Sequence, residues 1–270
     1  MTKQILVFAA HGDDMEFTSG GTIAKFTDRG HKVALVVATD NDKGSFELSA
    51  HELRAARDKE IHAAADLLGI DRVICLGYSD GELREQCPIT ELRARFMHII
   101  REIKPDITMT WDPFTPYEGH PDHQTVAQAA NEAASFSHFP LYHPDQLKDG
   151  LEAHFVGEHW YFAKSPRDQN KFVDITDYVD KKIEALYLHE SQMVLTVQDL
   201  LYALNASGLS VPGLDGLDPH DYTAVIDKQI RAVTGAVGRA HGFDYAEGFR
   251  VSRYGAIPRL ARGQELEEDV

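Results

Sequence analysis

The stretch QILVFAAHGDD, residues 4–14, joins an apolar run to a compact polar cluster. A short run rich in Ile, Leu, Val and Phe is typical of a strand buried on both faces of a sheet. The polar cluster offers the imidazole of His11 and the carboxylates of Asp13 and Asp14. The arrangement recurs further along, where Gly119-His120-Pro121-Asp122-His123 comes shortly after the apolar run Ile107–Trp111.

The two clusters together contain the groups that a hydrolytic zinc site uses. Such a site needs three nitrogen or oxygen ligands, an open position for water and a base beside that water. The first cluster has the spacing His-x-Asp-Asp and the second has the spacing His-x-x-His. Neither motif is strong evidence alone, so the prediction depends on whether the fold brings the two together.

Strand and helix patterns alternate through the first half of the chain. The predicted strands are Gln4–Ala10, Lys32–Thr39, Arg72–Leu76 and Asp106–Trp111. The predicted helices are Ser19–Asp28, Ser49–Leu68, Ile89–Ile103 and Asp122–Ala134. This order predicts an α/β fold: a Rossmann-like, three-layer α/β/α arrangement with a mostly parallel sheet, right-handed crossovers and C-terminal elaborations.

The predicted fold would place the two clusters side by side. In a doubly wound sheet with strand order 3-2-1-4, strands 1 and 4 are neighbours, and ligands bind outside their carboxyl ends. The cluster of His11 comes after strand 1 and the cluster of His123 comes after strand 4. Two motifs about 110 residues apart are thus expected to form one site.

Coordination chemistry then suggests a role for each side chain. We expect His11, Asp14 and His123 to bind one Zn²⁺ per chain, although an N₂O set does not distinguish zinc from iron(II) or another divalent ion. Asp13 is the expected general base.

The remaining residues of the second cluster have expected roles too. His120 would stabilise the oxyanion or protonate the departing amine, and Asp122 would orient a histidine. The competing interpretation is that His11 and His123 only cap the helices after them, with Asp13 and Asp14 complementing a helix N-terminus.

The second half of the chain gives weaker signals. The predicted strands are Phe155–Ala163, Lys171–Asp174 and Phe249–Arg253; the predicted helices are Thr176–Glu190 and Tyr222–Arg239. Leu204–Pro219 is predicted to be a loop and Arg262–Val270 an acidic, frayed tail. No internal repeat or linker interrupts the chain, which predicts a single domain over 1–270, with a core of about 1–200 and an elaboration of about 200–270.

Composition narrows the class of partner. The chain has 43 acidic and 27 basic residues, a formal charge of −16, which disfavours nucleic acid and anionic membranes as partners. The charge fits a small neutral or cationic substrate, or simply solubility. No apolar run approaches the roughly 20 residues of a membrane span, and Met1–Gln4 lacks a signal-peptide pattern. These features predict a cytoplasmic protein.

Several other residues have plainer interpretations. Cys75 lies in an apolar run and is predicted to be buried, without a disulfide to Cys87. Single histidines such as His62, His98 and His154 are predicted to be surface or packing residues. The Gly20-Gly21 pair lacks the spacing of a phosphate-binding loop and is predicted to let a helix pack closely beneath the site.

The motifs resemble those of the LmbE-like (PIG-L) family of zinc-dependent N-acetylglucosaminyl deacetylases. Its signature of Ala-His-x-Asp-Asp and His-Pro-Asp-His corresponds to Ala10–Asp14 and His120–His123. Further similar segments are Gly20–Ala24, Arg57-x-x-Glu60, Asp80–Leu83, Asp174–Thr176 with Lys182 and Ser191-Gln192, and Tyr245–Phe249.

The resemblance implies a Rossmann-like fold and hydrolysis of an acetamide on an amino sugar. By carry-over, His11, Asp14 and His123 are zinc ligands, Asp13 is the base, His120 the oxyanion partner, and Arg57 an arginine that reaches the substrate. The run Asp112–Glu118 resembles the diacetylchitobiose deacetylase branch, whose members include hexamers, and this implies a homo-oligomer. Tyr245–Phe249 instead resembles the branch that acts on N-acetylglucosaminyl malate.

Three functions are compatible with these residues. The leading hypothesis is a metal-dependent N-deacetylase acting on an N-acetyl sugar. The second is hydration of an unsaturated carboxylic acid, which some relatives of this fold perform. The third is a sugar-binding or metal-storage protein with a degraded site, supported only by Gly12, where the family often has proline and where glycine is expected to loosen the ligand loop.

Overall fold

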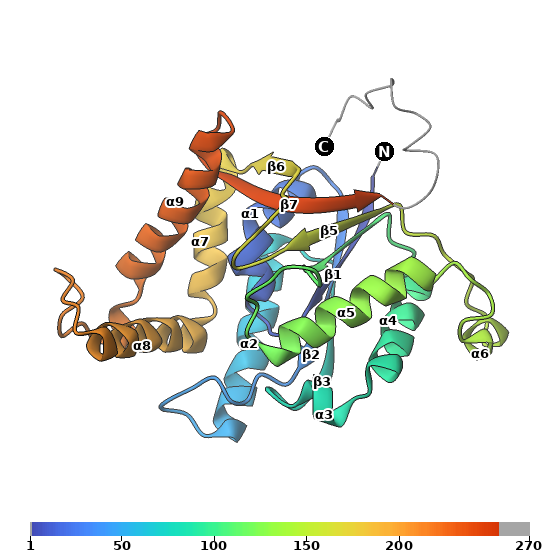
Figure 1. Ribbon diagram of the computed structural model, residues 1–270, viewed down its shortest axis with the longest axis horizontal. Coiled ribbons are helices and arrows are strands. Elements are labelled where there is room, and N and C mark those ends of the chain that lie inside the picture. The colour runs from blue at the N-terminus through green and yellow to red at the C-terminus, as the bar shows by residue number, and fades with distance from the viewer. Residues whose placement is uncertain (1, 254–270) are drawn as a thin grey trace.

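The protein is built on one seven-stranded sheet with helices on both faces (Figure 1); the computed structural model describes residues 2–253. The strand order is β3-β2-β1-β4-β5-β7-β6. Its first four members are β1 (Gln4–Ala9), β2 (Lys32–Thr39), β3 (Arg72–Tyr78) and β4 (Ile107–Trp111), all parallel. The predicted order 3-2-1-4 and the predicted fold class are confirmed.

The central strand β1 is buried on both faces, as its unbroken apolar run predicts. Val7 pairs with Leu35 of β2 on one side and with Met109 of β4 on the other. Side chains of successive residues point to opposite faces of a strand. Val7 accordingly packs in one apolar cluster and Phe8 in the other, where Phe8 contacts the ring of Phe96.

Helices cover the two faces of the sheet. One cluster packs beneath α1 (Asp14–Asp28), α2 (Ala50–Leu68), α7 (Val179–Tyr187) and α9 (Thr223–Ala240), and the other beneath α4 (Ile89–Ile103) and α5 (Pro121–Phe136). The ends of α2 agree with the sequence signals. Ser49 and Glu52 form a reciprocal capping box, and Gly69 ends the helix in the left-handed conformation with φ +74°.

The structure corrects several sequence-based boundaries in the first half. Helix α1 begins at Asp14 rather than Ser19, so the glycine pair lies near the middle of the helix instead of at its start. A Cβ on Gly21 would lie 2.7 Å from Ile175 Cδ1, so close packing explains why glycine is kept there. The short helices α3 (Leu83–Gln86) and α6 (Pro144–Lys148) were not predicted. Cys75 is exposed rather than buried because β3 is an edge strand; both cysteines are free thiols.

The second half of the chain adds three strands to the sheet and the helices α7, α8 and α9 beside it. β5 (Glu158–Phe162) runs parallel to β4, whereas β7 (Ala246–Arg253) is antiparallel to both β5 and β6 (Lys171–Asp174). The single helix predicted over Thr176–Glu190 is wrong. The chain forms a 3₁₀ turn at Thr176–Tyr178, then α7, and after His189 turns into α8 (Glu190–Ser207), which was not predicted.

The predicted loop Leu204–Pro219 is partly helical, because α8 continues to Ser207 before the chain leaves it; a 3₁₀ turn at Pro219–Asp221 comes next. The predicted acidic tail Arg262–Val270 lies outside the described residues. Within residues 2–253, no helix combines the length and the apolarity that a membrane span requires.

Candidate metal centre

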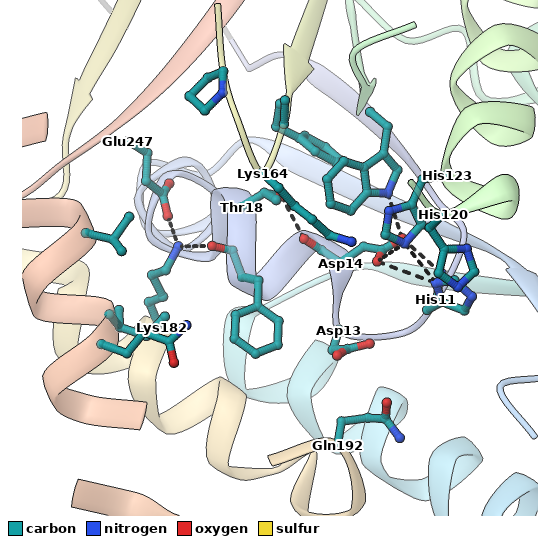
Figure 2. Close-up of a pocket in the computed structure, with 18 of the residues that line it drawn as sticks. His11, Asp13, Asp14, Thr18, His120, His123, Lys164, Lys182, Gln192 and Glu247 are labelled. Carbon is teal, nitrogen blue, oxygen red and sulfur yellow. Dashed lines mark hydrogen bonds and ion pairs between the residues drawn. The ribbon is translucent and has the colours of Figure 1, made fainter. Parts of the chain in front are cut away.

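The side chains of the site come after the carboxyl ends of three strands of the parallel sheet, β1, β3 and β4. His11 and Asp14 come after β1, Asp80 after β3, and His120 and His123 after β4. Because parallel strands present their carboxyl ends at one edge, side chains from distant segments converge there. Figure 2 shows the rings of His11, His120 and His123 gathered around Asp14. The predicted meeting of the two motifs is found.

Three atoms form a compact triangle at the centre of this group. His11 Nδ1 lies 3.1 Å from His123 Nε2, His123 Nε2 lies 3.3 Å from Asp14 Oδ1, and His11 Nδ1 lies 3.7 Å from Asp14 Oδ1. Ligands at about 2.0–2.2 Å from a tetrahedral zinc lie roughly 3.3–3.6 Å apart. The separations therefore fit one small cation between these atoms.

The outer atoms of the same side chains fix which atoms can act as ligands. Asp14 Oδ2 accepts hydrogen bonds from the backbone N–H of Ala10 (2.8 Å) and of His11 (3.0 Å) and from Trp111 Nε1 (2.8 Å). Three donors satisfy Oδ2, which leaves Oδ1 as the free acceptor directed at His11 and His123. The Asp14 carboxylate thus has one oxygen for the protein and one for the centre.

His11 is oriented by two carboxylates on its other nitrogen. Its Nε2 lies 3.1 Å from Asp80 Oδ1 and 3.5 Å from Asp122 Oδ2. Asp122 is fully buried and also accepts the backbone N–H of Gly81 at 2.7 Å. A proton on Nε2 satisfies the carboxylates and leaves the Nδ1 lone pair facing the triangle. Asp122 lies where it was expected, whereas Asp80 was missed as a partner of His11; its position directly after the third strand was the available signal.

His123 is held in the same manner from β4 and its loop. Its Nδ1 lies 3.2 Å from Glu118 Oε1, and its ring stacks on Trp111 with centroids 4.0 Å apart. A carboxylate at Nδ1 places the proton there and the lone pair on Nε2, the atom in the triangle. Glu118 was also not predicted. Two imidazole lone pairs and one carboxylate oxygen therefore converge at 3.1–3.7 Å, an arrangement that a cation stabilises.

The pKa shifts of His11 and Asp14 also favour positive charge at the centre of this group. Burial lowers the pKa of His11, but the neighbouring carboxylates of Asp122, Asp14 and Asp80 outweigh it and leave this pKa well above its ordinary value. Burial raises the pKa of Asp14, but His123 and His11 outweigh it, and the net pKa lies well below its usual range. In the protein alone, the carboxylates stabilise positive charge on the rings, the charge that a bound cation would otherwise supply.

His120 caps a helix and also faces the cluster. Its Nδ1 accepts the backbone N–H of Asp122 at 3.3 Å at the start of α5. Its ring stacks on His123 with centroids 4.5 Å apart, and ring nitrogens of His11, His120 and His123 lie within 4.8 Å of one another. Because Nδ1 is an acceptor, the Nε2 of a neutral ring carries a proton that it can donate. Helix capping was considered for His11 and His123, but the histidine that caps a helix is His120.

Asp13 differs from the adjacent Asp14 in its surroundings. Its side chain is 15% exposed and lines a cavity, and its Oδ1 accepts a hydrogen bond from the guanidinium of Arg57 at 3.1 Å. The Arg57 guanidinium also donates to Glu60 at 2.9 Å and to His189 Nδ1 at 3.0 Å. Arg57 is 1% exposed and supports Asp13 from behind; its predicted contact with substrate is not part of this arrangement.

Gly12 is accommodated by two residues of the surrounding loops. A Cβ at this position would lie 2.2 Å from Ile61 Cγ1, so Ile61 occupies the space of any side chain. The backbone N–H of Gly12 donates to Asn41 Oδ1 at 2.8 Å, a bond that proline could not make. The ligand loop is therefore held by packing and by a side-chain hydrogen bond, in contrast to the loosening expected from glycine alone.

The centre opens into a cavity of about 710 Å³. Figure 2 shows the histidines and Asp14 at one end and the ion pair of Lys182 with Glu247 at the other, with Thr18 and Lys164 between them. The Lys182–Glu247 contact of 2.5 Å is almost fully buried. The arrangement can bind a small molecule beside three converging ligand atoms and the carboxylate of Asp13.

The chain is similar in sequence and fold to known proteins. Residues 6–134 match the family model described as PIG-L, GlcNAc-PI de-N-acetylase. The diacetylchitobiose deacetylase of Thermococcus kodakarensis is 32% identical over 252 residues, which cover 92% of this chain and 82% of the relative. The solved structure of the N,N'-diacetylchitobiose deacetylase of Pyrococcus horikoshii is 31% identical, with a TM-score of 0.76 over 93% of this chain and 84% of that one.

The hydratase alternative has a structural counterpart that is more distant. The 4-carboxy-2-hydroxymuconate hydratase of Pseudomonas putida superposes with a TM-score of 0.66 over 94% of this chain and 98% of its own. Its sequence identity is 20%, so the similarity is one of fold alone.

Proposed function

We propose that this chain, which belongs to the PIG-L family, removes the acetyl group from a small N-acetylglucosamine-type sugar in a zinc-dependent reaction. The enzyme is a hydrolytic N-deacetylase. One observation carries the proposal for its mechanism: His11 Nδ1, Asp14 Oδ1 and His123 Nε2 converge within 3.7 Å at the mouth of a cavity that Asp13 also lines.

The donor set fits a zinc ion. His11, Asp14 and His123 would hold it, with Asp80, Asp122 and Glu118 orienting the two imidazoles. When bound, the metal supplies a Lewis acid that polarises the acetamide carbonyl and makes water more acidic. Two nitrogen ligands and one oxygen ligand suit zinc. Metal analysis of the purified protein identifies which divalent ion is bound.

The protein's own groups would move the protons. The Asp13 carboxylate faces the cavity and is held through one oxygen by Arg57, so its other oxygen can take a proton from the attacking water. The Nε2–H of His120 can donate to the carbonyl oxygen as negative charge develops there. Breaking the C–N bond then releases acetate and the amine, which leaves with a proton.

The diacetylchitobiose-type substrate is the finer part of the proposal. The two proteins that support it are the deacetylases of Thermococcus kodakarensis and Pyrococcus horikoshii, each matched over more than nine-tenths of this chain. A cavity of about 710 Å³ falls within the usual range of roughly 300–1,000 Å³ for small-molecule sites. Hydration has only the shared fold in its favour, and we do not propose it.

The experiment pairs metal content with release of free amine. Purified protein should contain about one zinc per chain and release amine from diacetylchitobiose. Asp13→Ala should lower kcat by about 10²-fold or more while keeping its zinc, because a general base is lost and no ligand is removed. Asp58→Ala, at a side chain 70% exposed on α2, is the matched control and should retain full activity.

Two outcomes would contradict parts of the proposal. A metal-replete Asp13→Ala protein with full activity would remove Asp13 from the role of base. Stoichiometric metal without amine release from any N-acetyl sugar would overturn the deacetylase assignment and favour a binding or storage role.

We further propose that the chain forms a homo-oligomer. The support is an exposed aromatic patch near α6, where Phe139 is 45%, Leu141 87% and Phe155 48% exposed. The ring of His138 contacts those of Phe139 and Phe155 and so connects them, and Leu141 comes two residues after Phe139. Contiguous exposed apolar surface commonly marks a protein interface. Light scattering should give an oligomeric mass that Leu141→Asp lowers; a wild-type monomer would contradict the proposal.

A further inference from the structure

The cavity has a second end that the reaction does not use. Beside the Lys182–Glu247 pair, the lining of the cavity includes five apolar side chains, and we call these five the apolar trough: Phe17, Leu195, Ile230, Val233 and Val237. They come from α1, α8 and α9. Figure 1 shows α8 and α9 together on one flank of the molecule, away from α4 and α6.

One face of α9 is directed into the trough. Ile230, Val233, Thr234 and Val237 all line the cavity, and their spacing of three and four residues places them on one side of a helix. Between Ile230 and Val237 this face is roughly 10 Å long at 1.5 Å per residue. Val233 is apolar and yet 59% exposed, so the larger part of its side chain is not covered by the described residues.

The trough begins close to the reacting groups. Phe17 lies four residues after Asp13, which is about one turn or 6 Å along α1. Beside Phe17, Thr18 and Lys164 provide polar atoms between the histidines and the far end of the cavity (Figure 2). A sugar ring needs such polar partners for its hydroxyl groups. In an N-acetylglucosaminide the acetamide is on C2, and the adjacent C1 is the position that carries the glycosidic substituent. With the acetamide at the histidines, such a substituent would be the apolar part of the substrate available to the trough.

The charges around the cavity disfavour an anionic group in that position. Each lysine that lines the cavity has an acidic partner: Lys43 with Glu82 at 2.7 Å, Lys164 with Glu118 at 3.4 Å and Lys182 with Glu247 at 2.5 Å. Asp13, Asp14 and Asp80 add further negative charge to the lining. A phosphate or carboxylate in the trough would find no unpaired lysine there.

We propose that the apolar trough binds a neutral alkyl or aryl aglycone, so that the preferred substrate is an N-acetylglucosaminide with an apolar group at C1. The inference rests on the proposed deacetylation, and it adds which substituent the cavity selects. Burial of an alkyl chain against these side chains supplies binding free energy of about 0.8 kcal/mol for each CH₂ group.

The test compares four substrates by amine release. Octyl N-acetyl-β-D-glucosaminide, used below its micelle-forming concentration, should exceed the methyl glycoside by about tenfold or more in kcat/KM. N-acetylglucosamine 1-phosphate should be poorer than the methyl glycoside. N-octanoylglucosamine carries the same chain on the acyl side and should gain nothing from it.

Two α9 variants connect any preference to the trough. Val233→Asp places a carboxylate in the trough, so kcat/KM should fall much more for the octyl glycoside than for the methyl glycoside, and the metal content should be kept. Ala232→Asp makes a comparable change at an exposed position outside the cavity lining and should keep the preference. Thermal unfolding of both variants checks that they are folded.

The outcomes separate this inference from the proposed function. Equal kcat/KM for the octyl and methyl glycosides would overturn the inference and leave the deacetylase intact. Faster reaction of N-octanoylglucosamine than of the octyl glycoside would overturn it as well, because the apolar group would then be acyl. No amine release from any substrate, diacetylchitobiose included, would overturn the proposed function and the inference with it.

Discussion

The two ends of the cavity are built on different principles. At the histidine end, His11, Asp14 and His123 are almost buried, and each is held by a hydrogen bond or ion pair on its outer atom. At the other end, the apolar trough is a face of α9 with Val233 59% exposed. The first end is attached to strand termini of the central sheet, and the second to helices packed on its flank.

This difference separates chemistry from selectivity. A group that must hold a cation within a few tenths of an ångström needs rigid strand ends and oriented ligands. A surface that only buries apolar area needs shape and tolerates change. Substitutions at the histidine end should therefore affect every substrate alike, whereas those in the trough should affect one substrate more than another.

The largest effect is expected from Asp14→Ala. This change removes a ligand atom and leaves the N–H groups of Ala10, His11 and Trp111 without their acceptor. Bound metal should be lost and amine release should fall on the order of 10³-fold for all substrates, methyl and octyl glycosides equally. Metal analysis and kinetics measure both. Loss of activity on only one of the two glycosides would contradict the separation of chemistry at the histidine end from selectivity in the trough.

A smaller effect is expected from Asp80→Asn. The change weakens the acceptor for His11 Nε2 but leaves the triangle of ligand atoms in place. Loss of such a supporting carboxylate typically lowers metal affinity by about 10–100-fold. Titration with a competing chelator measures it, with Asp58→Asn as the exposed control. Unchanged affinity would mean that Asp122 alone orients His11.

Gly12→Ala tests how the ligand loop is held. The new Cβ would overlap Ile61, and overpacking of this kind costs about 1–3 kcal/mol in the free energy of unfolding. Urea unfolding measures this cost. The double variant with Ile61→Ala should be less destabilised than the sum of the single changes, because the added methyl then has space. If the changes in the free energy of unfolding were additive, the loop at residue 12 would have moved to accommodate the new methyl group, and Ile61 would not be the obstacle.

A separate prediction concerns pH and His159, a histidine that is not part of the cavity lining. Burial lowers the pKa of His159 on β5 from 6.5 to about 4. In the unfolded chain the ring is protonated below about pH 6.5, whereas in the folded protein it is protonated only below about pH 4. The free energy of unfolding should therefore decrease as pH falls from about 6.5 to 4. Below about pH 4 this contribution should not change further.

The expected loss from His159 is about 3 kcal/mol. Urea unfolding at several pH values measures it, and His159→Gln should flatten the decline. This separates acid loss of the fold from acid loss of bound metal at the histidine end. An equal decline in His159→Gln would assign the effect to other groups.

The sequence predicted the histidine end well and the other end poorly. His11, Asp13, Asp14, His120 and His123 could be found because each comes after a strand that its own apolar pattern identifies. Asp80 was missed as a partner of His11 because the segment after β3 reaches His11 past the end of β2, which lies between β3 and β1. Cys75 was predicted to be buried because an apolar run does not reveal that its strand lies at the edge of the sheet.

Helix α8 and the surroundings of Arg57 show which features the local sequence pattern did not predict. The chain turns at His189 between two helices, and nothing in the local pattern separates Thr176–Glu190 from the residues of α8. Arg57 was expected to reach substrate, yet in the structure it is enclosed by Asp13, Glu60 and His189, which are far apart in sequence. Such partners cannot be derived from residue spacing.

By itself, the sequence determined the parallel sheet, the strand order around β1 and the two motifs that meet at its switch point. Those features depend on local apolar periodicity and on rules of chain connection, which a single chain displays directly. Only the tertiary structure decided which carboxylates orient the histidines, how Gly12 is supported and where the apolar trough lies. Those features depend on contacts between segments that are distant in sequence, and such contacts are settled by packing in three dimensions.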